Sequence, residues 1–266
     1  MMLYDEVTDT LVTACFDGHG ENGDLVARYL RDKISENLIC HPLFSTDLRR
    51  AILETIRNAE KTMIQRFYKE CAFSGTTLCL CTIRDNRLVT ANIGDSRIVL
   101  CGNDTATAIT IDHKADLPVE RQRIENSGGR VVSKDYGGGN SGPARVYLKY
   151  ADIPGLAMSR SLGDCVPHEA GVSSEPEFFE RDIDPTDQFI IVATDGIWDF
   201  TSPQEAADLI LLHSSPESAL SGLLRESYSK WITKVGGGVM DDTSAIVIYL
   251  NNWRRGAHGN STCRGN

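Results

Sequence analysis

Four aspartates in the sequence occupy the same local position, at the point where a run of apolar residues ends in a turn. They are Asp17 in Ala-Cys-Phe-Asp-Gly-His-Gly, Asp95 in Asn-Ile-Gly-Asp-Ser-Arg, Asp195 in Val-Ala-Thr-Asp-Gly-Ile-Trp-Asp and Asp241 in Gly-Val-Met-Asp-Asp-Thr. Any one of them is explained as a turn former, because aspartate is common in turns. If the strands are neighbours, however, their ends gather four like charges, which costs free energy unless protons or cations neutralise them. The repeated pattern therefore predicts a carboxylate cluster that binds cations.

The residue types favour a hard divalent cation. Carboxylates with no thiolate beside them and a single nearby histidine suit Mg²⁺ or Mn²⁺ better than Zn²⁺ or copper. Gly18, directly after Asp17, leaves its backbone carbonyl open to an ion as well. Two such ions can activate water and clamp a phosphoryl group, which is metal-assisted hydrolysis. His19 is then placed to protonate a leaving alkoxide, although a lone histidine at such a position is more often only a turn residue.

The composition is that of a folded, acidic protein. The 266 residues include 27 Lys and Arg against 37 Asp and Glu, a net charge of −10, and 41% of them are hydrophobic. This balance disfavours a nucleic-acid binder, because it offers no basic excess to neutralise phosphates. The sequence has no apolar run long enough for a membrane span and no secretion signal after Met1. We therefore expect a cytoplasmic or nuclear protein whose cysteines are reduced and fill core positions. The cysteines are Cys15, Cys40, Cys71, Cys79, Cys81, Cys101, Cys165 and Cys263.

The elements that must position these residues can be predicted from apolar periodicity and turn signals. Strands are expected over 10–16, 76–83, 87–93, 97–101, 188–194 and 243–250, and helices from Asn22 or Asp24, after Thr46, over 118–126, from Ser202 and over 215–233. The runs between 76 and 101 suggest one antiparallel meander, and residues 133–144 a flexible loop. Because helices and strands do not alternate strictly, a doubly wound parallel sheet is disfavoured. The order predicts an α+β fold in one domain, residues 1–251, in which two packed, mostly antiparallel β-sheets are flanked by pairs of α-helices (an αββα sandwich), with a disordered tail over 252–266.

Taken in order, the motifs resemble the metal-dependent serine/threonine protein phosphatases of the 2C type (the PPM family), in the form found in plants and protists. The similarity extends from about Leu11 to Leu250. It rests on residues 16–20, 74–77, 92–97, 112–114, 120–131, 155–164, 175–178, 195–199 and 241–247. The resemblance implies hydrolysis of phosphoserine and phosphothreonine in proteins, with Mg²⁺ or Mn²⁺ as cofactors, phosphoproteins as substrates and a monomeric chain.

The resemblance also implies roles for individual residues. Asp17 corresponds to the ligand that bridges two core metals, and the Gly18 carbonyl to a ligand of one of them. Asp195 and Asp241 correspond to further ligands of the metal centre, and His19 to the general acid. The remaining correspondences are Asp95 and Asp199, which with Asp195 match a weaker third-metal position, and residues 146–180, which match the flap beside the cleft. Asp242 receives no role.

One part of the family pattern is not found. Family members have a strand upstream of Asp-Gly-His-Gly with an arginine that grips the substrate phosphate, whereas only 16 residues precede Asp17 here and none is arginine. We expect this strand to be missing and substrate binding to weaken by about 2 kcal/mol or more, unless Arg160 or Arg97 replaces the arginine. The alternative function is therefore a catalytically weakened, phosphatase-like binding or regulatory protein. A two-metal nuclease is disfavoured by the charge of −10.

Overall fold

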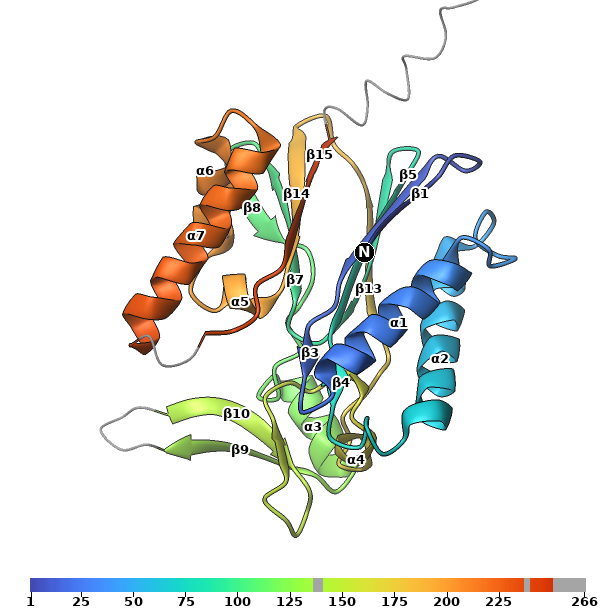
Figure 1. Ribbon diagram of the computed structural model, residues 1–266, viewed down its shortest axis with the longest axis vertical. Coiled ribbons are helices and arrows are strands. Elements are labelled where there is room, and N and C mark those ends of the chain that lie inside the picture. The colour runs from blue at the N-terminus through green and yellow to red at the C-terminus, as the bar shows by residue number, and fades with distance from the viewer. Residues whose placement is uncertain (136–140, 237–239, 251–266) are drawn as a thin grey trace, which may run out of the picture.

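Two β-sheets packed face to face form the centre of the molecule (Figure 1). The computed structural model describes residues 1–135, 141–236 and 240–250. The first sheet has the order β1-β2-β5-β6-β13 and the second β15-β14-β7-β8, and neighbouring strands are antiparallel. The strands of the first sheet are β1 (Met2–Asp5), β2 (Thr10–Cys15), β5 (Leu78–Arg84), β6 (Arg87–Ile93) and β13 (Glu177–Asp182). Those of the second are β7 (Arg97–Gly102), β8 (Thr105–Ala108), β14 (Asp187–Ala193) and β15 (Ala245–Tyr249).

Helices cover the outer face of each sheet, as the predicted sandwich requires. α1 (Gly23–Leu38) and α2 (Leu48–Phe67) pack on the first sheet, and α5 (Asp195–Trp198), α6 (Pro203–Leu211) and α7 (Pro216–Val235) on the second (Figure 1). The layer order, helix–sheet–sheet–helix, confirms the predicted α+β architecture. None of the helices in the described part of the chain is both long and apolar enough to cross a membrane.

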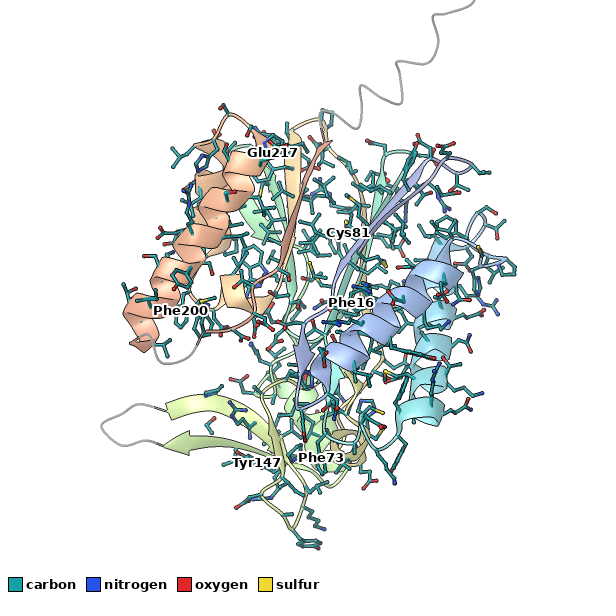
Figure 2. All side chains as sticks on the ribbon, in the orientation of Figure 1. Phe16, Phe73, Cys81, Tyr147, Phe200 and Glu217 are labelled. Carbon is teal, nitrogen blue, oxygen red and sulfur yellow. The ribbon has the colours of Figure 1, made fainter. Side chains whose placement is uncertain are left out.

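The alternation of side chains along the strands builds three hydrophobic cores. One lies between the first sheet and its helices, one between the two sheets, and one between the second sheet and its helices. In β5, Leu78 and Leu80 face α1 and α2, whereas Cys79 and Cys81 face the space between the sheets. Cys81 is seen in that space in Figure 2. Adjacent residues of a strand point to opposite faces, so a continuous apolar run is what a strand buried on both sides needs. This burial fixes the register of both sheets and with it the place where each strand ends.

Two smaller sheets lie at one end of the sandwich. One consists of β9 (Arg130–Asp135), β10 (Ser141–Tyr147) and β11 (Pro154–Leu156), near α3 (Pro118–Asn126) and α4 (Cys165–Glu169). The other consists of β3 (Gly18–His19), β4 (Gly75–Thr76) and β12 (Leu162–Gly163). Figure 1 shows the β9–β10 hairpin projecting below the second sheet and its helices.

Several sequence predictions need correction. The three runs between 76 and 101 do not form one meander, because β7 leaves the sheet of β5 and β6 and pairs with β14. Both ends of the predicted loop 133–144 belong to the paired strands β9 and β10, which the glycines of this stretch concealed in the sequence. Cys40 is exposed rather than in the core, and Cys165 is only partly buried. The predicted tail, 252–266, lies outside the described residues, as does Cys263.

Candidate metal centre and cleft

The predicted carboxylates converge because the strands of both sheets end at the same edge. β2 and β6 run in the same direction, since each pairs antiparallel with β5, so Asp17 and Asp95 follow them at one end of the first sheet. β14 ends just before Asp195, and β15, antiparallel to it, begins after Asp241. The step from β6 to β7 takes the chain from the first sheet to the second, which places Asp95 at the junction of the two.

A cleft of about 710 Å³ opens at this edge. Every site residue predicted from the sequence lines it, namely Asp17, Gly18, His19, Asp95, Asp195, Asp199 and Asp241. The opposite wall comes largely from the β9–β10–β11 sheet and the residues that follow it, including Pro143, Arg145, Leu156 and Met158. The cleft therefore has an acidic floor and a wall that is mostly apolar.

The aspartates repel one another in the cleft. Burial raises the pKa of Asp17 to about 7, and the nearby charges of Asp241 and Asp95 contribute to the increase. Burial likewise raises the pKa of Asp195 to about 9, with contributions from Asp95 and Asp17. The pKa values of Asp199 and Asp241 are also raised, again chiefly by burial. Without cations, the cluster therefore holds protons at a pH at which ordinary aspartates have lost them.

The chemistry of this donor set fits a hard divalent ion, because it offers carboxylate oxygens that gain from a positive charge. Within residues 1–135, 141–236 and 240–250, no group of three or more His, Cys, Asp or Glu side chains is already arranged to hold a metal ion. The fit is therefore one of donor type and electrostatics, and the coordination geometry remains a prediction.

Lys114 supplies a positive charge inside the cleft. Its Nζ donates a hydrogen bond to Asp95 Oδ2 over 2.6 Å, and Asp95 is only 2% exposed. Burial by itself lowers the pKa of Lys114, but the charges of Asp95 and Asp199 outweigh it and the pKa is raised. A third ion at Asp95 would have to share this carboxylate with the ammonium group.

His19 is held by a carboxylate that the sequence did not identify. His19 Nε2 and Asp164 Oδ2 are 2.5 Å apart, and Ser161 Oγ donates to the same Asp164 oxygen over 2.6 Å. Burial acts to lower the pKa of His19, but the hydrogen bond and charge of Asp164, with the charges of Asp95 and Asp17, raise it overall. The imidazolium form is thus favoured beside the carboxylate cluster.

Gly75 explains how His19 and Asp164 reach each other. In the small β3–β4–β12 sheet, His19 pairs with Gly75 on one side and Gly163 pairs with it on the other. A Cβ atom on Gly75 would collide with the Asp164 carboxylate. The glycine of Ser-Gly-Thr-Thr therefore leaves the space in which the pair forms.

Comparison with known proteins identifies the family of the chain. The sequence profile described as "Protein phosphatase 2C" matches residues 6–234. The chain belongs to the protein phosphatase 2C family. It is 34% identical over 255 residues to "Probable protein phosphatase 2C 64" of Oryza sativa subsp. japonica, covering 91% of this chain and 59% of that protein. It is also 34% identical over 272 residues to "Probable protein phosphatase 2C 73" of Arabidopsis thaliana, covering 91% and 72%. The family predicted from the motifs is confirmed.

Solved structures show the same fold. A serine-threonine phosphatase 2C from Toxoplasma gondii superposes with a TM-score of 0.77 at 20% identity, covering 90% of this chain and 84% of that one. A sex-determining protein of C. elegans gives 0.73 at 24% identity, covering 92% and 59%. The chain spans about three fifths of the length of the first curated relatives, 59% and 62%.

The predicted flap of this phosphatase 2C chain, residues 146–180, has several parts. Residues 154–158 line the cleft. Residues 162–169 contain β12, which belongs to the small sheet that includes His19, and α4, and from Glu177 the chain joins the first sheet as β13. Residues 154–158 form one wall of the cleft, and Asp164 of the second part lines it as well.

The arginines suggested from the sequence as phosphate ligands are occupied elsewhere. Arg97 makes two hydrogen bonds to Asp112, of 2.8 and 2.6 Å, and Arg160 is bound to Glu120 over 2.8 Å. Neither is among the residues that line the cleft. Arg145 does line it, and donates to the Gly155 carbonyl over 2.6 Å. Its position in the cleft depends on the β9–β10 pairing, which the sequence pattern did not indicate.

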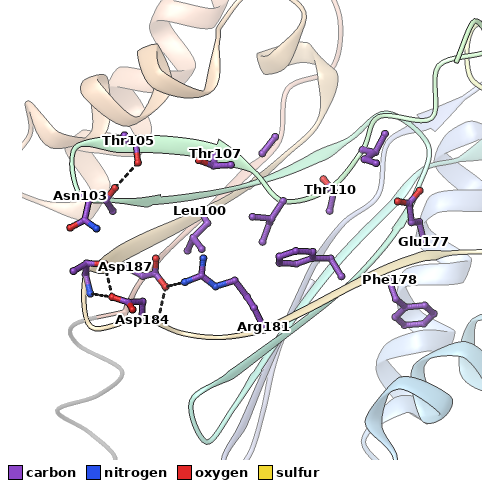
Figure 3. Close-up of a pocket in the computed structure, with 16 residues that line it drawn as sticks. Leu100, Asn103, Thr105, Thr107, Thr110, Glu177, Phe178, Arg181, Asp184 and Asp187 are labelled. Atoms are coloured by element: carbon purple, nitrogen blue, oxygen red, sulfur yellow. Dashed lines mark hydrogen bonds and ion pairs between the residues drawn. The ribbon is translucent and has the colours of Figure 1, made fainter.

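A second pocket of about 660 Å³ lies near the edge strands β8 and β13, and Figure 3 shows its lining. Leu100 and Phe178 contribute apolar surface, and Arg181 donates to Asp187 over 2.7 Å. None of the predicted site residues lines this pocket, so we place the candidate site in the acidic cleft.

Proposed function

We propose that the chain hydrolyses phosphoserine and phosphothreonine in proteins, using Mg²⁺ or Mn²⁺ held by the aspartates of the acidic cleft. The observation that carries the proposal is the convergence of Asp17, Asp195 and Asp241 with His19 in one cleft, in a member of the phosphatase 2C family. The mutual repulsion of these carboxylates favours a bound cation.

Particular residues would hold the ions. Asp17, with the Gly18 carbonyl, and Asp195 and Asp241 are the proposed ligands of two core ions, and Asp95 and Asp199 those of a weaker third. When bound, such ions neutralise phosphate charge and lower the pKa of water toward neutrality, which supplies the nucleophile.

His19 is the proposed general acid. Asp164 holds its Nε2, and the hydrogen bond and charge of Asp164 raise the pKa of His19, which favours the protonated ring that a general acid needs. Its Nδ1 is buried and has no partner among the described residues, so this is the nitrogen available to donate a proton. The proton would go to the serine or threonine oxygen as its bond to phosphorus breaks, which spares an unstable alkoxide.

Arg145 and Lys114 are the proposed contacts for the substrate phosphate. They are the lysine and arginine side chains among the described residues that line the cleft. Lys114 is already bound to Asp95, whereas the other Arg145 nitrogens can turn to an anion while Nη1 holds Gly155. Beside them, Leu156, Met158 and the 49%-exposed ring of Phe73 offer apolar surface to the peptide that flanks the phosphoresidue.

A direct assay tests the proposal. Phosphate release from a phosphothreonine peptide and from a phosphotyrosine peptide should be followed with and without Mn²⁺, alongside calorimetric titration of Mn²⁺. We expect Mn²⁺-dependent release from the phosphothreonine peptide and little from phosphotyrosine. Metal binding without any hydrolysis would instead identify a phosphatase-like binding protein, and the absence of both would reject the proposal.

A further inference from the structure

Two cysteines lie in contact next to Asp164, the residue that holds the proposed general acid. Cys71 Sγ and Cys165 Sγ are 3.7 Å apart. Their backbones are also joined, because Cys165 N–H donates to the Cys71 carbonyl over 2.9 Å and Val166 N–H to the Ala72 carbonyl over 3.0 Å. Cys71 comes just before β4, whereas Cys165 begins α4, so 94 residues of sequence separate them.

The contact between these two segments also positions His19, the proposed general acid. Asp164, the residue before Cys165, donates its backbone N–H to the Ser74 carbonyl over 3.0 Å and binds His19 through its side chain. Ser74 Oγ in turn accepts the backbone N–H of Asn22, three residues beyond His19. Any movement of Cys71 toward Cys165 therefore acts on the segments that orient His19.

We propose that Cys71 and Cys165 form a reversible disulfide when a peroxide or a similar two-electron oxidant reaches them, and that the disulfide slows hydrolysis by displacing Asp164 and His19. The sulfur atoms must approach by roughly 1.6 Å to reach bonding distance. Because the backbones are already paired, side-chain rotation and a small shift of α4 could achieve this. The effect on hydrolysis rests on the proposed function, whereas formation of the disulfide does not.

The chemistry balances with a peroxide as oxidant. The Cys165 thiolate attacks one peroxide oxygen, the O–O bond breaks, and one water leaves once the released hydroxide is protonated. The Cys71 sulfur then attacks the Cys165 sulfenic acid, forming the S–S bond and releasing the second water. Overall two thiols and one hydrogen peroxide become one disulfide and two waters, and a dithiol reductant reverses the change.

The difference in exposure between the two cysteines indicates that Cys165 reacts with the oxidant first. Cys165 is partly exposed, whereas Cys71 is fully buried and its Sγ donates to the Phe67 carbonyl over 2.8 Å. Burial raises the pKa of Cys71 to about 12 and also raises that of Cys165, so the thiolate fraction at neutral pH is small. We therefore expect slow oxidation that accelerates as the pH rises.

The other described cysteines offer comparison sites. Cys15 and Cys79 are opposite each other on β2 and β5, but both are buried in the core between the sheets, out of reach of an oxidant. Cys40 is exposed and follows α1. It serves as a matched control, since it can be oxidised without touching the segments around His19.

The test combines cross-link mapping with two activity assays on the full chain. Reduced protein is treated with hydrogen peroxide or diamide, digested without reduction, and analysed for linked peptides. We expect a 71–165 link that forms in wild type and in Cys40→Ser but not in Cys165→Ser or Cys71→Ala. Two such variants are used because replacing buried Cys71 could by itself lower stability. A link elsewhere, such as 15–79, or no link after complete reaction of Cys40, would overturn the proposal.

The two activity assays distinguish a specific effect of oxidation on His19 from a general loss of enzyme activity. We expect oxidation to slow phosphothreonine-peptide hydrolysis by roughly 10-fold to 10²-fold, within the reach of lost general acid catalysis, with full recovery in dithiothreitol. Nitrophenyl phosphate, whose leaving group needs no proton, should be affected much less. A 71–165 disulfide that leaves both rates unchanged would overturn the regulatory part. A reduced enzyme without activity would instead contradict the proposed function. The cross-link mapping would in that case still show whether the 71–165 disulfide forms.

Discussion

At the scale of single residues, the environment of His19 decides what it can do. Its Nε2 is fixed by Asp164, and its pKa is raised despite burial. We expect His19→Ala to slow hydrolysis of a phosphothreonine peptide by about 10²-fold or more, the contribution of general acid catalysis, with a much smaller loss on nitrophenyl phosphate. Steady-state rates on both substrates measure this.

Asp164→Asn provides the matched comparison for His19. It keeps the size of the side chain but removes the charge that favours imidazolium, so the same substrate selectivity should appear with a smaller loss. Equal losses on both substrates in His19→Ala would mean that the histidine has only a structural role.

Arg145 has a different expected signature. If it contacts the substrate phosphate in the ground state, Arg145→Ala should raise KM about tenfold or more, as the loss of a charged hydrogen bond does, and change kcat little. Lys149→Ala, an exposed lysine just beyond the end of the same strand β10, is the control and should behave as wild type. An unchanged KM in Arg145→Ala would remove this residue from the substrate site.

The sequence could reveal some of these residues and not others. The aspartates Asp17, Asp95 and Asp195 were found because each follows a strand with a turn signal, and Asp241 because it stands in a similar turn signal just before β15, which is local information. Asp164 and Lys114 lie in motifs that were recognised, yet nothing local pairs Asp164 with His19, 145 residues away. The function of Gly75 likewise depends on two neighbours that only the folded β3–β4–β12 sheet brings together.

At the scale of elements, α3 anchors Ser159 and Arg160, which directly follow the residues 154–158 that line the cleft. Glu120 of α3 is 3% exposed, and it accepts hydrogen bonds from Ser159 Oγ over 2.5 Å and from Arg160 over 2.8 Å. It also pairs with Arg123 over 2.8 Å. Burial acts against the charge, but Arg160, Ser159 and Arg123 outweigh it and lower the pKa of Glu120 to about 2.

We expect Glu120→Gln to lower the free energy of unfolding by about 3 kcal/mol, because Arg160 then keeps a partly buried charge without its carboxylate. Since the folded pKa lies below the ordinary 4.5, this stabilisation is present above about pH 4.5 and is lost as the pH falls toward 2. Urea unfolding at pH 7 and pH 3 measures both. Glu125→Gln, an exposed carboxylate on the same helix, should change stability by less than about 0.5 kcal/mol. Equal effects of the two substitutions would contradict the assigned anchor.

Element prediction succeeded where local start and stop signals are strong. The predicted 118–126 helix matches α3, which begins at Pro118 and ends before Gly128-Gly129, and the Ser202 capping box is present with Pro203 at the first helical position. Prediction failed where strand pairing depends on tertiary contacts. Gly94 to Ser96 form an ordinary turn signal, which suggests that β7 pairs with β6. In the folded protein β7 pairs with β14 in the other sheet instead. The β1 strand, whose side chains are half exposed, has no periodicity strong enough to predict it.

At the scale of the whole molecule, the carboxylate cluster sets a pH dependence. The pKa values of Asp17 and Asp195 are raised to about 7 and about 9, above the ordinary 3.8. Between about pH 4 and pH 9 the folded, metal-free state therefore binds more protons than the unfolded state, so stability falls as the pH rises.

Urea unfolding in a metal chelator at pH 5, 7 and 9 should show this decline, and Mn²⁺ should reverse it by binding the folded state. Asp195→Asn should flatten the profile because it removes one of the titrating charges. A metal-free protein that gains stability from pH 5 to pH 9 would contradict the assigned cluster.

The most direct test of the central claim is the Mn²⁺ dependence of phosphate release from a phosphothreonine peptide by wild type and by Asp195→Asn. Asp242→Asn serves as the control, since Asp242 is an exposed carboxylate beside Asp241 that has no assigned role. We expect wild type and Asp242→Asn to show the same saturable activation. Asp195→Asn should remain folded, be at least as stable without metal, and lose nearly all Mn²⁺-dependent turnover. Full activity of Asp195→Asn at the Mn²⁺ concentration that saturates wild type would contradict the assignment of this cleft as the metal-dependent catalytic site.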